Sequence, residues 1–168
     1  MIEVLEPGPL TTIQDDGRVG YRALGVARSG AFDRGAASLA NRLVGNAPGA
    51  AVLETTLGGL VFRALDAVTV ALAGARCPGV GWGTPITLRA GEVVHLGVPP
   101  GGLRSYLAVR GGVLVPPELG SRSSDRLGQL GPPPLSAGRR LDIGPQPNAP
   151  GSVPETGQEG RCDVSLRF

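Results

Sequence analysis

Five consecutive residues near the start of the chain have side chains suited to acid–base chemistry. The run Gln14-Asp15-Asp16-Gly17-Arg18 places an amide, two carboxylic acids and a guanidinium around a glycine turn. A carboxylate pair beside an arginine can keep one acid ionised while the other works as a base. The same run can instead form an Asx turn in which Arg18 fixes the loop by a bidentate salt bridge. Asp15, Asp16 and Arg18 are the candidate catalytic residues and Gln14 a candidate substrate ligand, with the structural alternative left open.

A second candidate lies at Ser29 and Gly30, shortly before a predicted helix. Backbone N–H groups at a helix N-terminus bind anions, so this turn is a candidate for holding a carboxylate or a phosphate. In the alternative interpretation, Asp33 is the helix N-cap and Gly30 is only a turn residue. The one histidine, His95, falls in a strand-like segment far from Ser29, which argues against a nucleophilic serine.

Four further polar residues are candidates for specific contacts. Asn41 interrupts an apolar helical pattern, where asparagine is a poor helix former, so it is predicted to have a specific partner. Arg110 and Arg122 stand beside small residues, which suits contact with a carboxylate or phosphate; surface salt bridges are the alternative. Glu54 is either a buried acid paired with an arginine or an exposed strand residue. Asn41, Arg110 and Arg122 join the candidate substrate ligands.

Short apolar segments bounded by glycine or proline dominate the chain and predict a mainly β fold, a sandwich or barrel. One short helix is predicted near residues 33–45, with Asp33 as its N-cap and Gly45-Asn46 as its left-handed exit. The run Val68–Ala73 is almost continuously apolar, which predicts a central strand covered on both faces. The expected strands are Ile2–Leu5, Thr11–Gln14, Ala51–Glu54, Leu60–Arg63, Val68–Ala73, Ile86–Leu88, Val93–Leu96 and Ser105–Arg110.

Composition narrows the class of protein. The 168 residues include 28 glycines and 16 prolines, but the net charge is only +2 and aliphatic residues are frequent enough for a folded, turn-rich domain. All basic residues are arginines, scattered among acids, so nucleic acid is not an expected partner. No uncharged apolar run is long enough to cross a bilayer, so a membrane is not expected either. One histidine and two distant cysteines do not support a zinc site or a disulfide framework. The acidic start of the chain predicts a cytoplasmic location.

Six motifs in order resemble the carboxyltransferase family once called allophanate hydrolase subunit 2. This family includes the C-type subunit of 5-oxoprolinase, the KipA regulators and a segment of urea carboxylase. The resemblance covers roughly residues 2–144. It departs from the family at residues 131–140, where a GGxxGR stretch and an acidic turn are usual. The motifs are Thr12–Tyr21, Gly25–Asp33, Leu39–Asn46, Leu53-Glu54, Tyr106–Gly112 and Leu119–Asp125.

The resemblance implies a cyclophilin-like β-barrel formed by residues 1–144, which would be the N-terminal lobe of a usually two-lobed chain. Residues 145–168, rich in proline and glycine, are expected to form a flexible tail or linker. The resemblance also implies a partner resembling allophanate hydrolase subunit 1 or the B-type subunit of 5-oxoprolinase.

Three functions are compatible with this resemblance. The first is the C-type subunit of an ATP-dependent 5-oxoprolinase, which binds a small carboxylate substrate and needs partner subunits. The second is a carboxyltransferase lobe of a biotin-dependent, urea carboxylase-like system. The third is a non-catalytic, KipA-like binding protein. Because the second lobe is missing, the chain alone is expected to be inactive.

Overall fold

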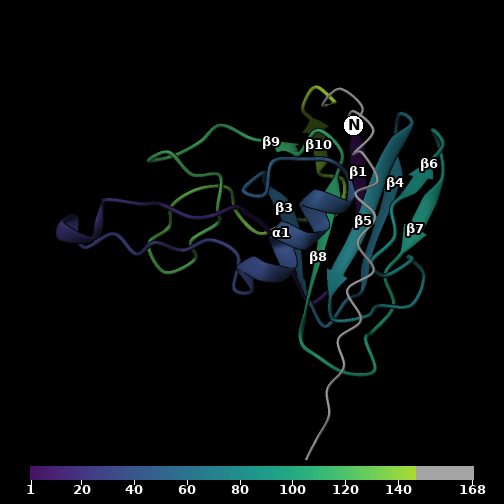
Figure 1. Cartoon of the computed structure of the whole chain (residues 1–168), viewed down its shortest axis with the longest axis horizontal. Helices are drawn as coiled ribbons and strands as arrows, with labels where there is room; N and C mark the ends of the chain where they lie inside the picture. The colour runs from purple at the N-terminus through teal and green to yellow at the C-terminus, as the bar shows by residue number, and fades with distance from the viewer. Residues whose placement is uncertain (147–168) are drawn as a thin grey trace, which may run out of the picture.

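Two antiparallel sheets of five strands each face one another across a single apolar core. The computed structural model describes residues 1–146. Strand order is β7-β4-β1-β10-β9 in the first sheet and β2-β3-β8-β5-β6 in the second (Figure 1). The strands are β1 Ile2–Pro7, β2 Leu10–Gln14, β3 Val52–Thr56, β4 Leu60–Ala64, β5 Val68–Gly74, β6 Ile86–Leu88, β7 Val93–His95, β8 Arg104–Val109, β9 Val113–Leu114 and β10 Arg140–Ile143.

The core forms because both sheets turn their apolar side chains inward, as alternation along a strand allows. Val4 and Phe62 of the first sheet are fully buried in one cluster with Leu53, Leu72 and Leu107 of the second. Each such side chain contributes roughly 1.5–3 kcal/mol on burial. This cluster holds the two sheets together.

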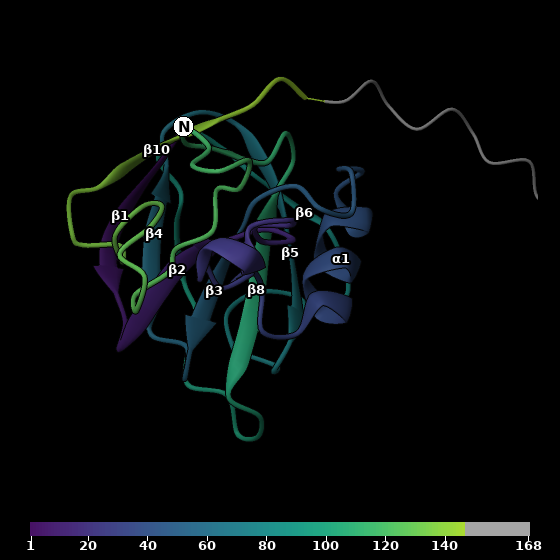
Figure 2. The same cartoon turned by 90° about the vertical axis from the view of Figure 1, so that its left-hand side faces the viewer.

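The helix α1, Arg34–Leu43, covers the outer face of the second sheet, so that β5 and β8 are buried on both sides (Figure 2). Asp33 caps it by accepting the Ala36 N–H at 2.9 Å. Gly45, at φ +76°, ends it, and the Asn46 N–H donates to the Asn41 carbonyl. Small residues permit the close approach of helix and sheet. The contact is made by Ala37, Ala40, Ala71, Ala73 and Ala108.

The expected fold class is confirmed: the chain is mainly β, with one α-helix among residues 1–146, and all eight predicted strands form. β9 and β10 were not predicted, because β9 has only two residues and the four of β10, Arg140–Ile143, include two charged side chains. They pair through Ile143 opposite Val113. The short 3₁₀ helix η1, Arg22–Leu24, was also unpredicted. Of the expected tail, residues 147–168 lie outside the described part.

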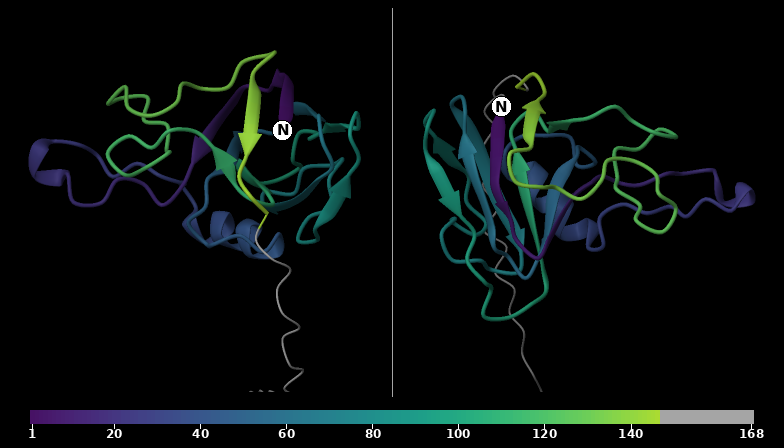
Figure 3. Two further views of the ribbon diagram at one scale, coloured as in Figure 1. Left: turned by 90° about the horizontal axis from the view of Figure 1, so that it is seen from above. Right: turned by 180° about the vertical axis from the view of Figure 1, so that it is seen from behind.

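Long connections gather at one end of the sheets. Residues 18–28, here called the arm, extend away from the sheets and carry η1 (Figures 1 and 3). Residues 121–135 follow the free edge of β2, where the Ser124 N–H donates to the Ile13 carbonyl and the Leu135 N–H to the Thr11 carbonyl, both at 2.9 Å. No helix in the described residues is long and apolar enough to cross a membrane.

Shortening a core side chain tests this packing. We expect Leu107→Ala to lower the free energy of unfolding by about 2–5 kcal/mol, because the cavity left at a fully buried site adds to the lost burial. Leu127→Ala is the matched control, since Leu127 is 99% exposed. Urea denaturation measures both. Equal stability of the two variants would contradict the assigned core.

Candidate functional site

Two glycines close the base of the arm. Gly17 and Gly30 both have positive φ, +82° and +89°, and a Cβ on Gly30 would lie 2.8 Å from the Gly17 nitrogen. This contact lets the two ends of the arm run side by side. The Arg18 N–H donates to the Arg28 carbonyl at 2.6 Å, and the Ala31 N–H donates to the Asp15 carbonyl at 2.9 Å.

The Asp15 carboxylate joins the base of the arm to the segment 121–123. Oδ1 accepts hydrogen bonds from the Ser121 hydroxyl at 2.6 Å, the Ser123 hydroxyl at 2.5 Å and the Gly17 N–H at 2.8 Å. Oδ2 accepts the Arg122 N–H at 2.6 Å. Burial opposes ionisation, but these hydrogen bonds together lower the pKa of Asp15. Asp15 is therefore a charged anchor for two loops that are far apart in sequence.

Arg18 is buried beside this anchor, with 2% of its surface exposed. Its Nη2 donates to the Ser123 carbonyl at 2.8 Å, while Nε and Nη1 have no partner among the described residues. Arg18 forms no ion pair with Asp15 or Asp16 in the described part of the chain, so the bidentate salt bridge considered from the sequence is not formed.

Ser29 and Asp125 complete the cluster. The Ser29 hydroxyl donates to Asp125 Oδ2 at 2.9 Å. The hydrogen bond from the Gly128 N–H has the largest effect and lowers the pKa of Asp125. Burial opposes it, but the Ser29 hydroxyl, the Leu127 N–H and the charge of Arg18 lower this pKa further. Asp125 is thus a second ionised carboxylate whose oxygens are already occupied.

The structure brings most of the predicted site residues together. Gln14 is buried next to the cluster, and its Nε2 donates to Thr12 Oγ1 at 3.0 Å and to the Ser124 carbonyl at 3.1 Å. Asp16 is exposed at the edge, where its carbonyl accepts a hydrogen bond from Arg28 Nε. Arg122 joins the cluster only through its backbone N–H, because its guanidinium Nε donates to the Val115 carbonyl at 2.9 Å. The other residues that meet here are Gln14, Asp15, Arg18, Ser29 and Gly30.

Asn41 and Arg110 lie elsewhere, near the end of α1. Asn41 is fully buried, and its Nδ2 donates to the carbonyls of Pro48 and Ala50, which confirms the expected specific partner. Asn46 donates to Asn41 Oδ1 and accepts the Gly111 N–H, next to Arg110. These contacts order the loop after the helix and tie it to the end of β8.

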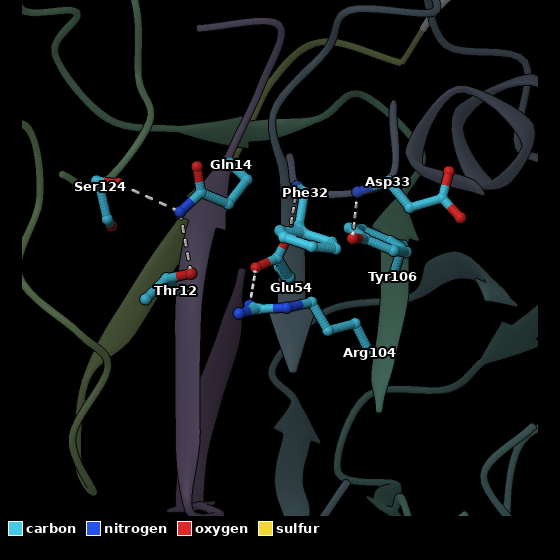
Figure 4. A network of polar contacts seen from close by, with 8 residues as sticks. All are labelled: Thr12, Gln14, Phe32, Asp33, Glu54, Arg104, Tyr106 and Ser124. Atoms are coloured by element: carbon cyan, nitrogen blue, oxygen red, sulfur yellow. Dashed lines mark hydrogen bonds and ion pairs between the residues drawn. The ribbon is translucent and has the colours of Figure 1, made fainter. Parts of the chain in front are cut away.

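A second polar network lies on the outer face of the second sheet beside α1, and sequence reasoning anticipated it only at Glu54 (Figure 4). Glu54 is 4% exposed and accepts hydrogen bonds from Arg104 Nη1 and, at 2.8 Å, from the Phe32 N–H. Glu54 is thus the buried, paired acid considered from the sequence. The Tyr106 hydroxyl accepts the Asp33 N–H at 2.7 Å; burial and the Glu54 charge raise the pKa of Tyr106, so it stays neutral.

The network forms one wall of a cavity of about 700 Å³. The ring of Phe32 is exposed and lies 5.0 Å from the guanidinium of Arg104. Arg76 contributes a second guanidinium to the cavity, stacked over Trp82 at 4.4 Å. Two guanidiniums beside an apolar ring suit a small molecule with one carboxylate and a compact body. The signal available in sequence was Glu54, a lone acid in an apolar strand that requires a cation.

No group of histidine, cysteine, aspartate and glutamate side chains among residues 1–146 could hold a metal ion. The groups that the two networks offer to a ligand are guanidiniums, hydroxyls, backbone amides and carboxylates.

Comparisons with known proteins agree with this architecture. The family model described as carboxyltransferase domain, subdomain A and B, matches residues 24–164. The C subunit of 5-oxoprolinase from Escherichia coli K12 is 41% identical over 155 residues, which are 86% of this chain and 49% of that protein. The urea amidolyase of Lachancea kluyveri is 40% identical over 77% of this chain and 7% of its own. A crystal structure of TTHA0988 superposes with a TM-score of 0.81 at 40% identity, over 89% of this chain and 32% of that one.

Removing the charge of Asp15 tests its role as an anchor. We expect Asp15→Asn to lower the free energy of unfolding at pH 7 by about 1.5–3 kcal/mol, because several hydrogen-bond donors lose their charged acceptor. Folding lowers the pKa of Asp15, so its contribution to stability is fully present above the unfolded pKa of 3.8. That contribution is lost as the pH falls from this value through the lower pKa of the folded state. The difference from the parent chain should therefore shrink below about pH 4.

The exposed neighbour offers a matched control, Asp16→Asn, which should leave stability within about 0.5 kcal/mol. Urea denaturation at pH 7 and pH 3 measures both variants. An Asp15→Asn protein as stable as the Asp16→Asn protein at pH 7 would exclude the anchoring role.

Proposed function

Because the chain belongs to the carboxyltransferase domain family, subdomains A and B, we propose that it is the C-type subunit of an ATP-dependent 5-oxoprolinase. The chain spans about half the length of the curated 5-oxoprolinase relatives it matches. The activity of the whole assembly, its substrates and its partner subunits are therefore part of the proposal. Residues 1–144 would form its carboxyltransferase-family lobe.

The observation that carries this proposal is the cavity beside Phe32. 5-Oxoproline is a compact five-membered lactam with one carboxylate. Arg76, which forms no ion pair within residues 1–146, matches that carboxylate in charge and shape beside the Glu54-paired Arg104, and the exposed Phe32 ring offers an apolar surface to the lactam ring. Glu54 fixes Arg104 and, through the Phe32 N–H, the backbone that carries the ring.

The lactam is a resonance-stabilised amide, so water attacks its carbonyl slowly. In the assembly, ATP would supply its γ-phosphoryl group to the lactam oxygen, with ADP leaving, which makes the carbonyl carbon a better electrophile. Addition of water to that carbon and breakage of the C–N bond would then leave a free amine and an acyl phosphate. A second water would hydrolyse the acyl phosphate to glutamate and inorganic phosphate. In this scheme the arginines bind substrate and Asp15 positions the loops, with Arg18 remaining available for an anion.

A partner resembling the B-type subunit of 5-oxoprolinase would complete the reaction centre, in the cytoplasm where ATP is plentiful. The exposed arm, with Val19 and Leu24 at 70% and 77% exposure, is the surface we assign to that contact. Exposed apolar side chains on a projecting loop suit a protein–protein interface.

The urea amidolyase relatives support a second candidate, a carboxyltransferase lobe that moves a carboxylate from carboxybiotin to a urea-like acceptor. The 168 residues contain no lysine, so biotin would be attached outside them. The two candidates differ in one requirement: only the second needs a biotin carrier. Reconstituted activity that is insensitive to avidin supports the 5-oxoprolinase.

Replacing Arg76 tests the substrate site. We expect Arg76→Gln to raise the KM for 5-oxoproline about 10- to 100-fold, as expected for loss of a charged hydrogen bond worth about 1.5–3 kcal/mol. Glutamate release is measured from a mixture of this chain, its partner subunits, 5-oxoproline and ATP. Arg89→Gln, a change at an exposed arginine outside the cavity, is the control. No glutamate release from any combination containing this chain would refute the proposal.

The purified chain by itself should not hydrolyse ATP or 5-oxoproline, because it provides a binding surface and no complete reaction centre. ATP turnover measured by phosphate release from the chain alone should equal the buffer background. Turnover above that background, abolished by boiling the sample, would show that the chain is catalytically self-sufficient.

A further inference from the structure

The arm encloses a second cavity, lined by residues 18–28, which the proposed substrate site does not use. Its volume is about 690 Å³. Three of the lining residues are arginines, and none is acidic. The others are small or apolar, so the chemistry of the cavity is that of Arg18, Arg22 and Arg28.

Arg18 forms no ion pair within residues 1–146. It is 98% removed from solvent, yet of its side-chain nitrogens only Nη2 has a hydrogen-bond partner in the described part of the chain, the Ser123 carbonyl. A buried guanidinium with two unpaired nitrogens is costly unless an anion neutralises it. Asp125 is the nearby acid, but its oxygens are taken by Ser29, Leu127 and Gly128, and no ion pair joins it to Arg18 within the described residues.

Arg22 and Arg28 bring two more positive charges to the same cavity. Both are exposed, and Arg28 is held at the base of the arm because its Nε donates to the Asp16 carbonyl at 3.1 Å. Arg22 is the first residue of η1 and also lines the cavity. Three guanidiniums around one space exceed what a single carboxylate neutralises, and they match the several oxygens and the higher charge of a phosphate.

We propose that the arm cavity is a binding site for a phosphate group, held by Arg18 at its buried end and by Arg22 and Arg28 at its open end. This inference concerns a different cavity from the carboxylate site and stands whether or not the 5-oxoprolinase proposal holds. The phosphate can belong to a nucleotide or be free phosphate or pyrophosphate. The chemistry of recognition is the same, and the experiment separates these sources.

The test is calorimetric titration of the purified 168-residue chain with pyrophosphate, phosphate, ADP and ATP, at constant ionic strength in chloride. We expect saturable binding of pyrophosphate that sulfate competes away. Arg22→Gln/Arg28→Gln should weaken this binding at least tenfold, because it removes two of the three guanidiniums of the cavity. Both positions are exposed, so the variant should keep its fold. Arg42→Gln/Arg89→Gln removes the same number of charges outside the cavity and should bind like the parent chain.

Arg18→Gln should abolish binding, and circular dichroism shows whether this variant is folded; if it is not, the exposed double variant decides. Nucleotides that bind at least tenfold tighter than pyrophosphate identify a nucleotide as the source of the phosphate, and equal affinities identify the free anion. The proposal is overturned if no phosphate compound binds saturably, or if the cavity variant and the control variant bind equally. Neither result depends on glutamate release, so a failure here is distinct from a failure of the proposed function.

Discussion

One carboxylate, that of Asp15, holds together the parts of this molecule that could carry function. Its oxygens accept hydrogen bonds from two serine hydroxyls and from two backbone amides, one of them at Arg122. The donors come from segments more than a hundred positions apart in sequence, and Asp15 is where most of the hydrogen bonds between them converge. A charge is needed because four donors converge on one group, and charge-assisted hydrogen bonds are the strong ones.

The backbone of Asp15 also fixes the short segment between the two cavities. Arg28 lines the arm cavity and Phe32 lines the carboxylate cavity, only four residues later. Between them, the Ala31 N–H donates to the Asp15 carbonyl, and the Phe32 N–H donates to Glu54. These two hydrogen bonds tie the segment to the end of β2 and to β3, so the two cavities are built on one anchored stretch of backbone.

The sequence predicted the strands and the helix, which depend on neighbouring residues, but did not reveal the contacts between segments that are far apart in the chain. The strands around Leu53, Leu72 and Leu107 and the helix after Asp33 were readable, because apolar periodicity and a cap are properties of neighbouring residues. The polar run around Asp15 was recognised as a site, but its partners at Ser121 and Ser123 were not, because loop closure leaves no trace in spacing. Arg104 was missed because its pairing with Glu54 depends on β3 and β8 being neighbours in the sheet, and no residue next to Arg104 in the sequence indicates this.

The covering of β2 has a consequence for association. An open strand edge offers unpaired amides to any other extended chain, and folded proteins protect such edges. Here the residues 121–135 occupy that edge through hydrogen bonds to Thr11 and Ile13. The other sheet borders, β6, β7 and β9, are only two or three residues long. Neither sheet therefore presents a long open edge among residues 1–146, which disfavours recognition of another protein by strand addition and favours recognition through side chains and loops.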